Sequence, residues 1–477
     1  MDKFVDRKSE LNELNHLLPT EHSQFLIVYG RRRVGKTTLL LHWAQQTGLP
    51  FIYNVSRRTS PEACRRDLAQ AVWNWAYPEV EAPAFSGWDA LFRQIARLVG
   101  DQQMILIWDE FPYAVEADKS LPSYLQAAWD HQFKDKHITL ILAGSHIGMM
   151  VDQMQYNAPL YGRFSGQLPI DAMPFGALQD FFPAYSPDER IAVYATLGGV
   201  PAYLERFNQQ LDFSANVRSQ LFQKIGMFRS EPIVLLSDLV RDAKPYEAIL
   251  RAIASGKHTA SEVGLESDIG VNNLPPYLKR LQEMRFIERR IPATTPPQHR
   301  DTTNKARYHV RDPYLRFYYR FIEPNLKMIE QELVVTLWDE ISEQFRAFVG
   351  ATAFEDLCRE WVLVQARARR LPFSPEFVGS HWARDAQVDI VAINWRQKAI
   401  LLGECKWGTD AVGRSVITEL HEKASTVIPG SDWTVYYAFF ARAGFTPAAR
   451  AEAQTLNAVL VDLSQLDQDL RDAIEHP

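Results

Sequence analysis

A short stretch near the N-terminus constrains the fold of this chain most strongly. Residues 29–38 read Y-G-R-R-R-V-G-K-T-T, a G-x-x-x-x-G-K-T pattern that directly follows the apolar run 25–28 and precedes the helix-forming run 39–44. A strand, a glycine-rich turn and a helix start are the context that a phosphate-binding loop requires. The sequence therefore predicts a P-loop that binds a nucleoside triphosphate.

The residue types of this loop suit phosphate chemistry. Two glycines let backbone N–H groups turn toward a β-phosphate, Lys36 reaches the β- and γ-oxygens, and the Thr37 hydroxyl binds Mg²⁺. We therefore expect ATP and Mg²⁺ as cofactors. The residues expected to bind nucleotide in this loop are Gly30, Arg31, Arg32, Arg33, Val34, Gly35, Lys36, Thr37 and Thr38.

Composition narrows the class of protein. The chain has 477 residues, 46% hydrophobic and 23% charged, which is typical of a globular protein with several domains. Its net charge of −6 means that nucleic-acid contact requires a local basic patch. Cys64, Cys358 and Cys405 lack disulfide or zinc spacing, the start lacks a signal-peptide core, and no apolar run is long enough to span a membrane. We expect a soluble, cytoplasmic protein without a membrane partner.

The pattern along the chain predicts a multidomain α/β protein. Apolar runs at 25–29, 104–108 and 139–143 have the length of buried parallel strands, and the helical stretches between them favour a doubly wound sheet. The expected organisation is a P-loop ATPase core at 1–171, a helical lid at 172–235, a winged helix-turn-helix at 236–312, an aromatic-rich connector at 313–345 and a small mixed α/β domain at 346–477.

Two further strand ends carry candidate catalytic residues. The run 105–108 ends in Asp109, which would contact Mg²⁺, and Glu110, which would polarise the attacking water. The run 140–143 ends near Ser145, which either senses the γ-phosphate or the attacking water, or is an ordinary serine in a turn. Arg163 is either an arginine finger, acting in cis or in trans, or a surface residue.

Four segments together resemble the archaeal-type ATPase family, on the STAND and AAA+ side of the P-loop enzymes. They are residues 4–7 (F-V-D-R), the loop 30–37, residues 159–163 (P-L-Y-G-R) and residues 198–201 (G-G-V-P). The resemblance implies that Pro201 lies in the lid near the nucleotide and reports its state. It also favours the arginine-finger role of Arg163 and allows a homo-oligomer. Relatives usually carry Gly-Ser-Ser where this chain has Gly144-Ser145-His146, which leaves the role of His146 open.

Residues 244–310 predict a winged helix. Helical segments at 244–254, 259–264 and 272–284 precede two short strand-like runs. The recognition helix would begin at Pro275-Pro276, because proline is tolerated in a first helical turn. Cations in the expected wing would contact DNA phosphates, or the module serves protein contacts. These cations are Arg289, Arg290, Arg300, Lys305 and Arg307.

A hairpin is expected at 387–406. Its antiparallel pairing would bring Asp389, near the start of the first strand, beside Glu404 and Lys406, near the end of the second. Two carboxylates can hold Mg²⁺ against a scissile phosphate, and the lysine can orient water and offset developing charge. A surface hairpin in which Lys406 simply pairs with an acid remains the alternative.

This hairpin, with an upstream helix that can contribute Glu355, resembles the PD-(D/E)xK nuclease superfamily. Val388 replaces the proline of that name. The resemblance implies a restriction-endonuclease-like domain at 346–477 and DNA as the partner. The leading hypothesis is an ATPase coupled to Mg²⁺-dependent DNA cleavage. The alternative is a STAND-type regulatory or oligomerisation switch whose inactive nuclease fold binds DNA or protein.

Overall fold

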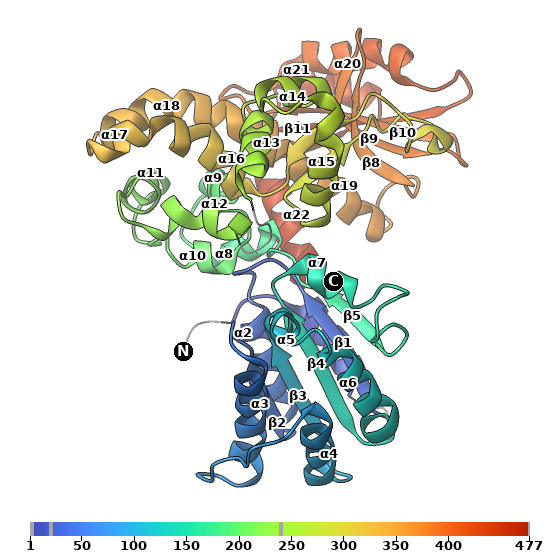
Figure 1. Ribbon diagram of the computed structural model, residues 1–477. Coiled ribbons are helices and arrows are strands. Elements are labelled where there is room, and N and C mark those ends of the chain that lie inside the picture. The colour runs from blue at the N-terminus through green and yellow to red at the C-terminus, as the bar shows by residue number, and fades with distance from the viewer. Residues whose placement is uncertain (1–3, 19–21, 238–241, 476–477) are drawn as a thin grey trace. The chain divides into compact units, whose positions relative to one another are not determined.

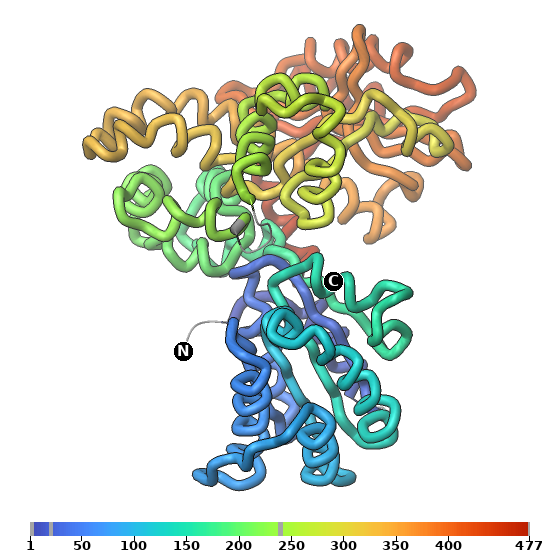
Figure 2. The backbone as a smooth tube through the Cα atoms, viewed as in Figure 1, coloured from blue at the N-terminus to red at the C-terminus, as the bar shows by residue number. Residues whose placement is uncertain are grey.

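The computed structural model describes residues 4–18, 22–237 and 242–475. The chain forms two compact units (Figures 1 and 2). The first comprises residues 1–173 together with 200–202, and the second comprises 174–199 and 203–477. Within the described residues, no helix combines the length and apolarity that crossing a bilayer needs.

A parallel five-stranded sheet forms the centre of the first unit, which confirms the predicted doubly wound core. Its order is β2-β3-β4-β1-β5, and every neighbouring pair is parallel (Figure 1). Strand β4 therefore separates β1 from β3, so the ends of these three strands meet at one edge. The strands are β1 (Gln24–Tyr29), β2 (Phe51–Val55), β3 (Met104–Asp109), β4 (Ile138–Gly144) and β5 (Gly166–Pro169).

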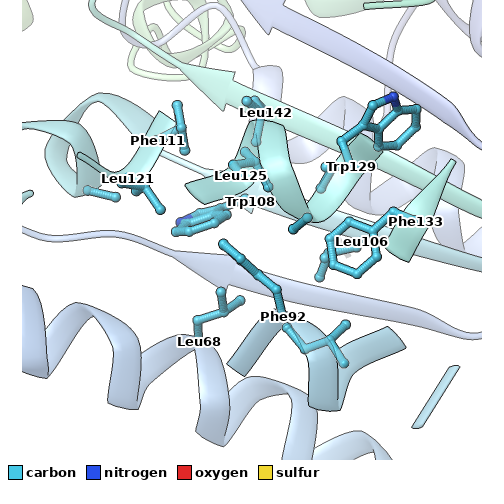
Figure 3. Packing of buried hydrophobic residues seen from close by; sticks show 14 of the residues in the cluster. Leu68, Phe92, Leu106, Trp108, Phe111, Leu121, Leu125, Trp129, Phe133 and Leu142 are labelled. Carbon is cyan, nitrogen blue, oxygen red and sulfur yellow. The ribbon is translucent and has the colours of Figure 1, made fainter. Parts of the chain in front are cut away.

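Helices bury both faces of this sheet, because successive strand residues point to opposite sides. On one face Leu106, Trp108 and Leu142 pack with Phe92 and Phe133 (Figure 3). Residues from the alternate positions of the strands pack on the other face against α1 and α2. The helices are α1 (Lys8–His16), α2 (Lys36–Thr47), α3 (Pro61–Ala76), α4 (Trp88–Val99), α5 (Phe111–Ala117), α6 (Leu121–Ala128) and α7 (Ile147–Asp152). A π-helical turn, η1 (Trp129–Phe133), extends α6.

The second unit begins with helices, as expected for 172–235. They are η2 (Phe175–Ala177), α8 (Leu178–Phe181), α9 (Pro187–Leu197), α10 (Pro201–Leu204), α11 (Phe213–Asn216), η3 (Val217–Leu221) and α12 (Met227–Ser237). Helix α9 starts with a capping box between Ser186 and Glu189, which fixes its first turn. It ends before Gly198, whose φ of 62° favours glycine. The first residues of α10 belong to the first unit by packing.

Three helices and a ribbon follow. Helices α13 (Lys244–Ala254), α14 (Ala260–Glu266) and α15 (Leu274–Glu283) precede an antiparallel pair, β6 (Ile287–Arg290) and β7 (Arg307–Val310). A short helical turn, η4 (Val271–Asn273), precedes α15, and a second one, η5 (Pro297–His299), lies in the loop between β6 and β7. Pro275 and Pro276 lie in the first turn of α15, as predicted, and Leu278, Leu281 and Met284 are buried. In Figure 2 this segment is drawn in yellow-green to yellow.

The predicted aromatic connector is helical, and its aromatic residues form a packed cluster. Phe317, Phe321 and Phe345 are buried and contact one another. The elements are α16 (Pro313–Phe317), η6 (Tyr318–Ile322), η7 (Glu323–Asn325), α17 (Leu326–Glu330), α18 (Val334–Val349), η8 (Gly350–Phe354) and α19 (Glu355–Arg367).

A mixed five-stranded sheet completes the second unit, in the order β12-β11-β10-β9-β8. The predicted hairpin is β9–β10, an antiparallel pair, whereas β10, β11 and β12 run parallel. The last strand is β12. The elements are β8 (Phe377–Trp382), β9 (Gln387–Asn394), β10 (Ala399–Lys406), α20 (Arg414–Val427), β11 (Thr434–Ala441), α21 (Pro447–Thr455), β12 (Val459–Asp462) and α22 (Leu463–Glu475).

Candidate functional site

The expected P-loop joins β1 to α2. Gly35 caps α2 with a φ of 89°, a conformation that glycine adopts without strain. Gly30 has a different reason to be glycine, because a Cβ there would lie 2.1 Å from the carbonyl oxygen of Ile170. Residue 30 is therefore a glycine because the segment that follows β5 approaches the end of β1 closely.

Lys36 is buried, with 6% of its surface exposed. Its Nζ donates to the carbonyl oxygens of Gly30 (2.8 Å) and Arg31 (3.0 Å) and lies 3.4 Å from the Ser145 Oγ. Burial lowers the pKa of Lys36 to about 8, although the charges of Glu110 and Asp109 oppose that shift. The ammonium group is thus fixed over the loop and remains mostly protonated at neutral pH.

Thr37 and Asp109 come together as predicted. The Thr37 hydroxyl donates to Asp109 Oδ2 at 2.5 Å, and the Tyr53 hydroxyl donates to the same oxygen at 3.1 Å. Burial, followed by the charge of Asp109, raises the pKa of Tyr53. Sequence reasoning missed Tyr53, although its place near the end of β2, beside β3, was a signal that it reaches this edge.

Glu110 and Ser145 are also paired. Ser145 donates to the Glu110 carboxylate with its backbone N–H (3.2 Å) and with its hydroxyl. Glu110 has a φ of 50°, which directs its side chain across the edge toward β4. His146 accepts a hydrogen bond from the Met149 N–H at 3.2 Å and caps α7. This contact gives a structural role to a residue that departs from the family pattern.

Side chains outside the loop hold it in place. Arg7 is buried and donates from Nη2 to the carbonyl oxygens of Val34 (2.7 Å) and Asp171 (2.9 Å). Arg32 donates to the Tyr113 hydroxyl at 2.7 Å. Arg7 lies in the first of the segments quoted for the family resemblance, and the structure shows why an arginine there supports nucleotide binding.

Two residues expected near the nucleotide have different surroundings. A Cβ on Gly35 would lie 3.9 Å from Pro201 Cγ, so Pro201 lies beside the P-loop. The guanidinium of Arg163 instead pairs with Asp130, at 3.0 Å between Nη2 and Oδ2, and donates to the Tyr161 carbonyl oxygen. The arginine-finger role of Arg163 stays a prediction that requires this ion pair to open.

The second candidate site lies where β9 begins and β10 ends. The strand pairing ends at Gly403 and Ile390, so Asp389 and Glu404 are the next residues on the two strands. Asp389 Oδ2 accepts from the Cys405 N–H at 3.0 Å, and Lys406 Nζ donates to Glu404 Oε1 at 2.6 Å. The predicted juxtaposition of these residues is thus what the hairpin produces.

Glu355, the first residue of α19, completes this cluster. Burial and the charge of Asp389 raise the pKa of Glu355 to about 7. The same two causes raise the pKa of Glu404. Arg359, one turn further on, lies 3.6 Å from Glu355 Oε2 and donates to the Asp389 carbonyl oxygen at 3.2 Å. Three carboxyl groups therefore share one small region.

Metal ligation was predicted for Thr37, Asp109, Asp389 and Glu404. Over residues 4–18, 22–237 and 242–475, no three His, Cys, Asp or Glu side chains are arranged as a metal-binding group. The predicted ligands supply one carboxylate at the P-loop and two at the hairpin, which are numbers that suit Mg²⁺, because this ion keeps several waters and binds one or two carboxylates.

Several cations expected to face DNA are engaged within the second unit. Arg289 donates to the carbonyl oxygens of Arg300 and Thr303. Arg300 stacks on Phe377 and Arg307 stacks on Trp382. The wing therefore packs against β8 through Arg300 and Arg307, whereas Arg289 holds the wing's own loop.

A P-loop between β1 and α2, with Thr37 bound to Asp109 and Glu110 beside Ser145, defines the protein as a P-loop ATPase. Residues 4–207 match the family of "ATPase domain predominantly from Archaea". Residues 318–420 match a second family, DUF234, described as "Archaea bacterial proteins of unknown function".

The chain is 31% identical over 438 residues to the uncharacterized protein MJECL04 of Methanocaldococcus jannaschii. The aligned region covers 91% of this chain and 94% of that protein. The chain therefore belongs to the same family as this protein, and its residues 4–207 form an archaeal-type ATPase domain.

Two solved structures resemble the chain. The Walker-type ATPase PABY2304 of Pyrococcus abyssi aligns with a TM-score of 0.51 and 20% identity, over 66% of this chain and 96% of that one. The ORC2 protein of Aeropyrum pernix aligns with a TM-score of 0.42 and 15% identity, over 71% and 97%. The first likeness extends the agreement in fold beyond the P-loop core, since that core alone is a smaller part of the chain.

Proposed function

We propose that this protein couples the nucleotide state of its ATPase domain to Mg²⁺-dependent cleavage of DNA by its C-terminal domain. One observation carries the proposal: Asp389, Glu404 and Lys406 meet at one end of the β9–β10 hairpin, with Glu355 next to them. The order α19, β8, β9, β10, α20, β11 supports a PD-(D/E)xK-like fold, because that superfamily builds its site on such a helix and hairpin.

The C-terminal residues fit a divalent cation. Asp389 and Glu404 are the acidic ligands, and burial together with the charge of Asp389 raises the pKa values of Glu355 and Glu404. Mg²⁺ would supply Lewis acidity at the scissile phosphate. Lys406 orients the attacking water and offsets charge on the departing oxygen. Glu355 accepts a proton from that water at a pH near its pKa of about 7.

At the N-terminal site, the chain's own residues would divide the work of hydrolysis. Lys36 would move its donors from the Gly30 and Arg31 carbonyl oxygens to the phosphate oxygens. Thr37 and Asp109 would hold Mg²⁺ between them, and Glu110 would orient water. Ser145 keeps Glu110 in position, and Arg163, released from Asp130, would offset the charge of the departing phosphoryl group.

DNA binding is assigned to the module at 242–312. Its three helices and antiparallel ribbon support a winged helix, with α15 as the recognition helix. Lys279 on α15 is exposed, whereas Arg280 pairs with Glu283 at 3.3 Å. Because Arg289, Arg300 and Arg307 contact their own chain, α15 rather than the wing is the better candidate for contact with the phosphates.

The test measures cleavage of plasmid and linear DNA with Mg²⁺, with and without ATP. The proteins compared are the wild type, Lys36→Ala, Asp389→Ala and the matched control Asp385→Ala, which changes an acid at the β8–β9 turn. We expect ATP-dependent cleavage by the wild type and the control. Cleavage by Lys36→Ala should no longer respond to ATP, and Asp389→Ala should not cleave DNA.

Equal cleavage by the wild type and Asp389→Ala would refute nuclease chemistry at this site. A nucleotide-dependent change of assembly, measured by light scattering, with no cleavage by any of the proteins would instead favour the regulatory switch.

A further inference from the structure

One carboxylate in the second unit is bound by three arginines from three different elements. Asp356, the second residue of α19, accepts from Arg290 of β6 (2.8 Å), from Arg316 of α16 (3.2 Å) and from Arg359 of its own helix. Burial alone would raise the pKa of Asp356, but the three guanidiniums hold it well below its ordinary value. We name these four residues the Asp356 node.

The node adjoins the candidate carboxylate site. Asp356 directly follows Glu355, and Arg359 also donates to the Ser380 hydroxyl (2.8 Å) and the Asp389 carbonyl oxygen (3.2 Å). Any displacement of the first turn of α19 therefore moves Glu355 relative to Asp389. The node fixes that turn, because bidentate or shared arginine contacts impose direction as well as attraction.

Helix α9 packs against the same region. It contacts α16 and the turn η8, which runs directly into α19. Its Tyr194 is surrounded by the charges of Glu360, Asp356 and Arg316, and burial followed by those acids raises its pKa. The first turns of α9 are held by Arg190, which lies one turn before Tyr194 and pairs with Asp467 of α22 at 2.5 Å.

The C-terminal end of α9 leads into a short connection to the ATPase unit. Gly198 and Gly199 connect it to Val200–Ala202, which pack within the ATPase unit, and Pro201 lies beside Gly35 of the P-loop. Gly198, with φ 62°, gives this connection a point at which backbone direction can change. One short helix thus links the P-loop neighbourhood by chain continuity to the turn that carries Glu355.

We propose that the Asp356 node is a positioning device that transmits the nucleotide state of the P-loop, through α9, to the Glu355 carboxylate. This inference rests on the proposed function for the identity of the site that is positioned. Arg290 and Arg316 act through Asp356 and do not touch substrate. They hold α19 in register with α9, so that a shift of the 198–202 connection changes the distance of Glu355 from Asp389.

The experiment is hydrogen–deuterium exchange on the full chain, with and without a non-hydrolysable ATP analogue. Peptides that cover 355–367 report the node, and peptides that cover the P-loop report nucleotide binding. We expect the analogue to alter exchange in both regions of the wild type and in neither region of Lys36→Ala. Arg290→Gln should keep the P-loop response and lose most of the α19 response.

The matched control is Arg289→Gln, because this neighbouring arginine contacts carbonyl oxygens of its own loop and not Asp356. It should respond as the wild type does. Arg290→Lys should recover part of the α19 response, since it keeps a cation at Asp356. Arg316→Gln provides a second break in the node, on another element, if Arg290→Gln does not fold.

Two outcomes overturn the proposal. The first is unchanged exchange in α19 of the wild type when the analogue alters exchange in the P-loop. The second is an equal change of α19 exchange in Arg290→Gln and Arg289→Gln. A node that behaves as expected in a protein that cleaves no DNA would leave the positioning device standing and remove the nuclease proposal. ATP-dependent cleavage without any α19 response would do the reverse.

Discussion

The two candidate sites both place a lysine beside acidic residues at strand ends, but they differ in what balances the charges. At the P-loop, Lys36 is buried and bound to neutral oxygen atoms, and Asp109 accepts from two hydroxyl groups. At the hairpin, the side chain of Lys406 is 42% exposed and binds a carboxylate directly. Asp389 lies close to that carboxylate, and Glu355 lies close to Asp389.

This difference shows how each site depends on a ligand. The P-loop site is a closed network of hydrogen bonds in which every residue already has its orientation. At the hairpin site, burial and then the charge of Asp389 raise the pKa values of Glu355 and Glu404, although Arg359 and Lys406 oppose these shifts. A divalent cation would therefore stabilise the hairpin site far more than the P-loop site, and removal of the metal should lower the stability of the hairpin site.

The largest expected effect tests the P-loop side of the comparison. Lys36→Ala removes the buried ammonium that would bind the β- and γ-phosphates, and we expect ATP hydrolysis to fall by about 10²- to 10³-fold, as when one preorganised donor is lost. Steady-state phosphate release measures this. Lys136→Ala, which removes a partly buried lysine paired with the exposed Asp101, is the control and should match the wild type. A Lys36→Ala protein with wild-type turnover would mean that hydrolysis takes place elsewhere.

The second prediction concerns pH at the hairpin site. The folded-state pKa of Glu355, about 7, exceeds its ordinary value of 4.5, so the folded protein holds this proton more tightly than the unfolded chain. Stability is therefore greatest below pH 4.5 as far as this group is concerned, and it falls between pH 4.5 and 7, by about 1–3 kcal/mol. Urea unfolding without metal, followed by circular dichroism, measures the fall.

Glu355→Gln should lack this fall, and Mn²⁺ should reverse it in the wild type at pH 8. Glu340→Gln, at an exposed glutamate of α18, is the matched control and should keep the wild-type pH dependence. A wild-type profile that is identical with and without Mn²⁺ would contradict a metal site at these carboxylates.

A third prediction compares two glycines that allow close approach. A Cβ on Gly30 would lie 2.1 Å from a backbone oxygen of β5's continuation, whereas one on Gly403 would lie 2.9 Å from Ile390 Cβ. We expect Gly30→Ala to destabilise its unit by about 1–3 kcal/mol. Gly403→Ala should destabilise by less, because its nearest contacts, at 2.9 Å to Ile390 Cβ and 3.0 Å to the Ala438 carbonyl oxygen, overlap much less. Thermal unfolding followed by circular dichroism measures both.

The control for this pair is Gly166→Ala. Gly166 lies on β5 with open space around its Cβ position, so the variant should remain within about 0.5 kcal/mol of the wild type. A Gly30→Ala protein as stable as Gly166→Ala would show that the loop relaxes away from Ile170.

Much of this molecule could be predicted from local pattern. The buried strands of the P-loop core are continuous apolar runs, and glycine-rich and proline-rich turns mark where they end, so the parallel sheet and its P-loop were predicted. The hairpin at 387–406 was predicted because two apolar runs flank a short polar turn, and the two strands pair antiparallel as expected.

What could not be predicted depends on long-range contacts. Nothing near Arg290 in the sequence indicates that it binds Asp356, which is 66 residues away. The contact of Arg7 with Asp171 spans 164 residues. The cations of the ribbon were expected to face DNA because their partners, Phe377 and Trp382, lie in a segment whose packing on the ribbon has no local signal.

The smallest effect distinguishes the two readings of Ser145 that the sequence left open. Its hydroxyl lies between Lys36 and the Glu110 carboxylate, so Ser145→Ala would leave Glu110 oriented by one backbone N–H alone. Loss of a hydrogen bond to a charged group is worth about 1.5 kcal/mol, so we expect kcat for ATP to fall about 10-fold with little change in KM. Ser123→Ala, at an exposed serine of α6, should leave both constants unchanged. If kcat of Ser145→Ala equals that of the wild type, the position of Glu110 does not depend on its contact with Ser145. The P-loop site would then not be the closed hydrogen-bond network that distinguishes it from the hairpin site.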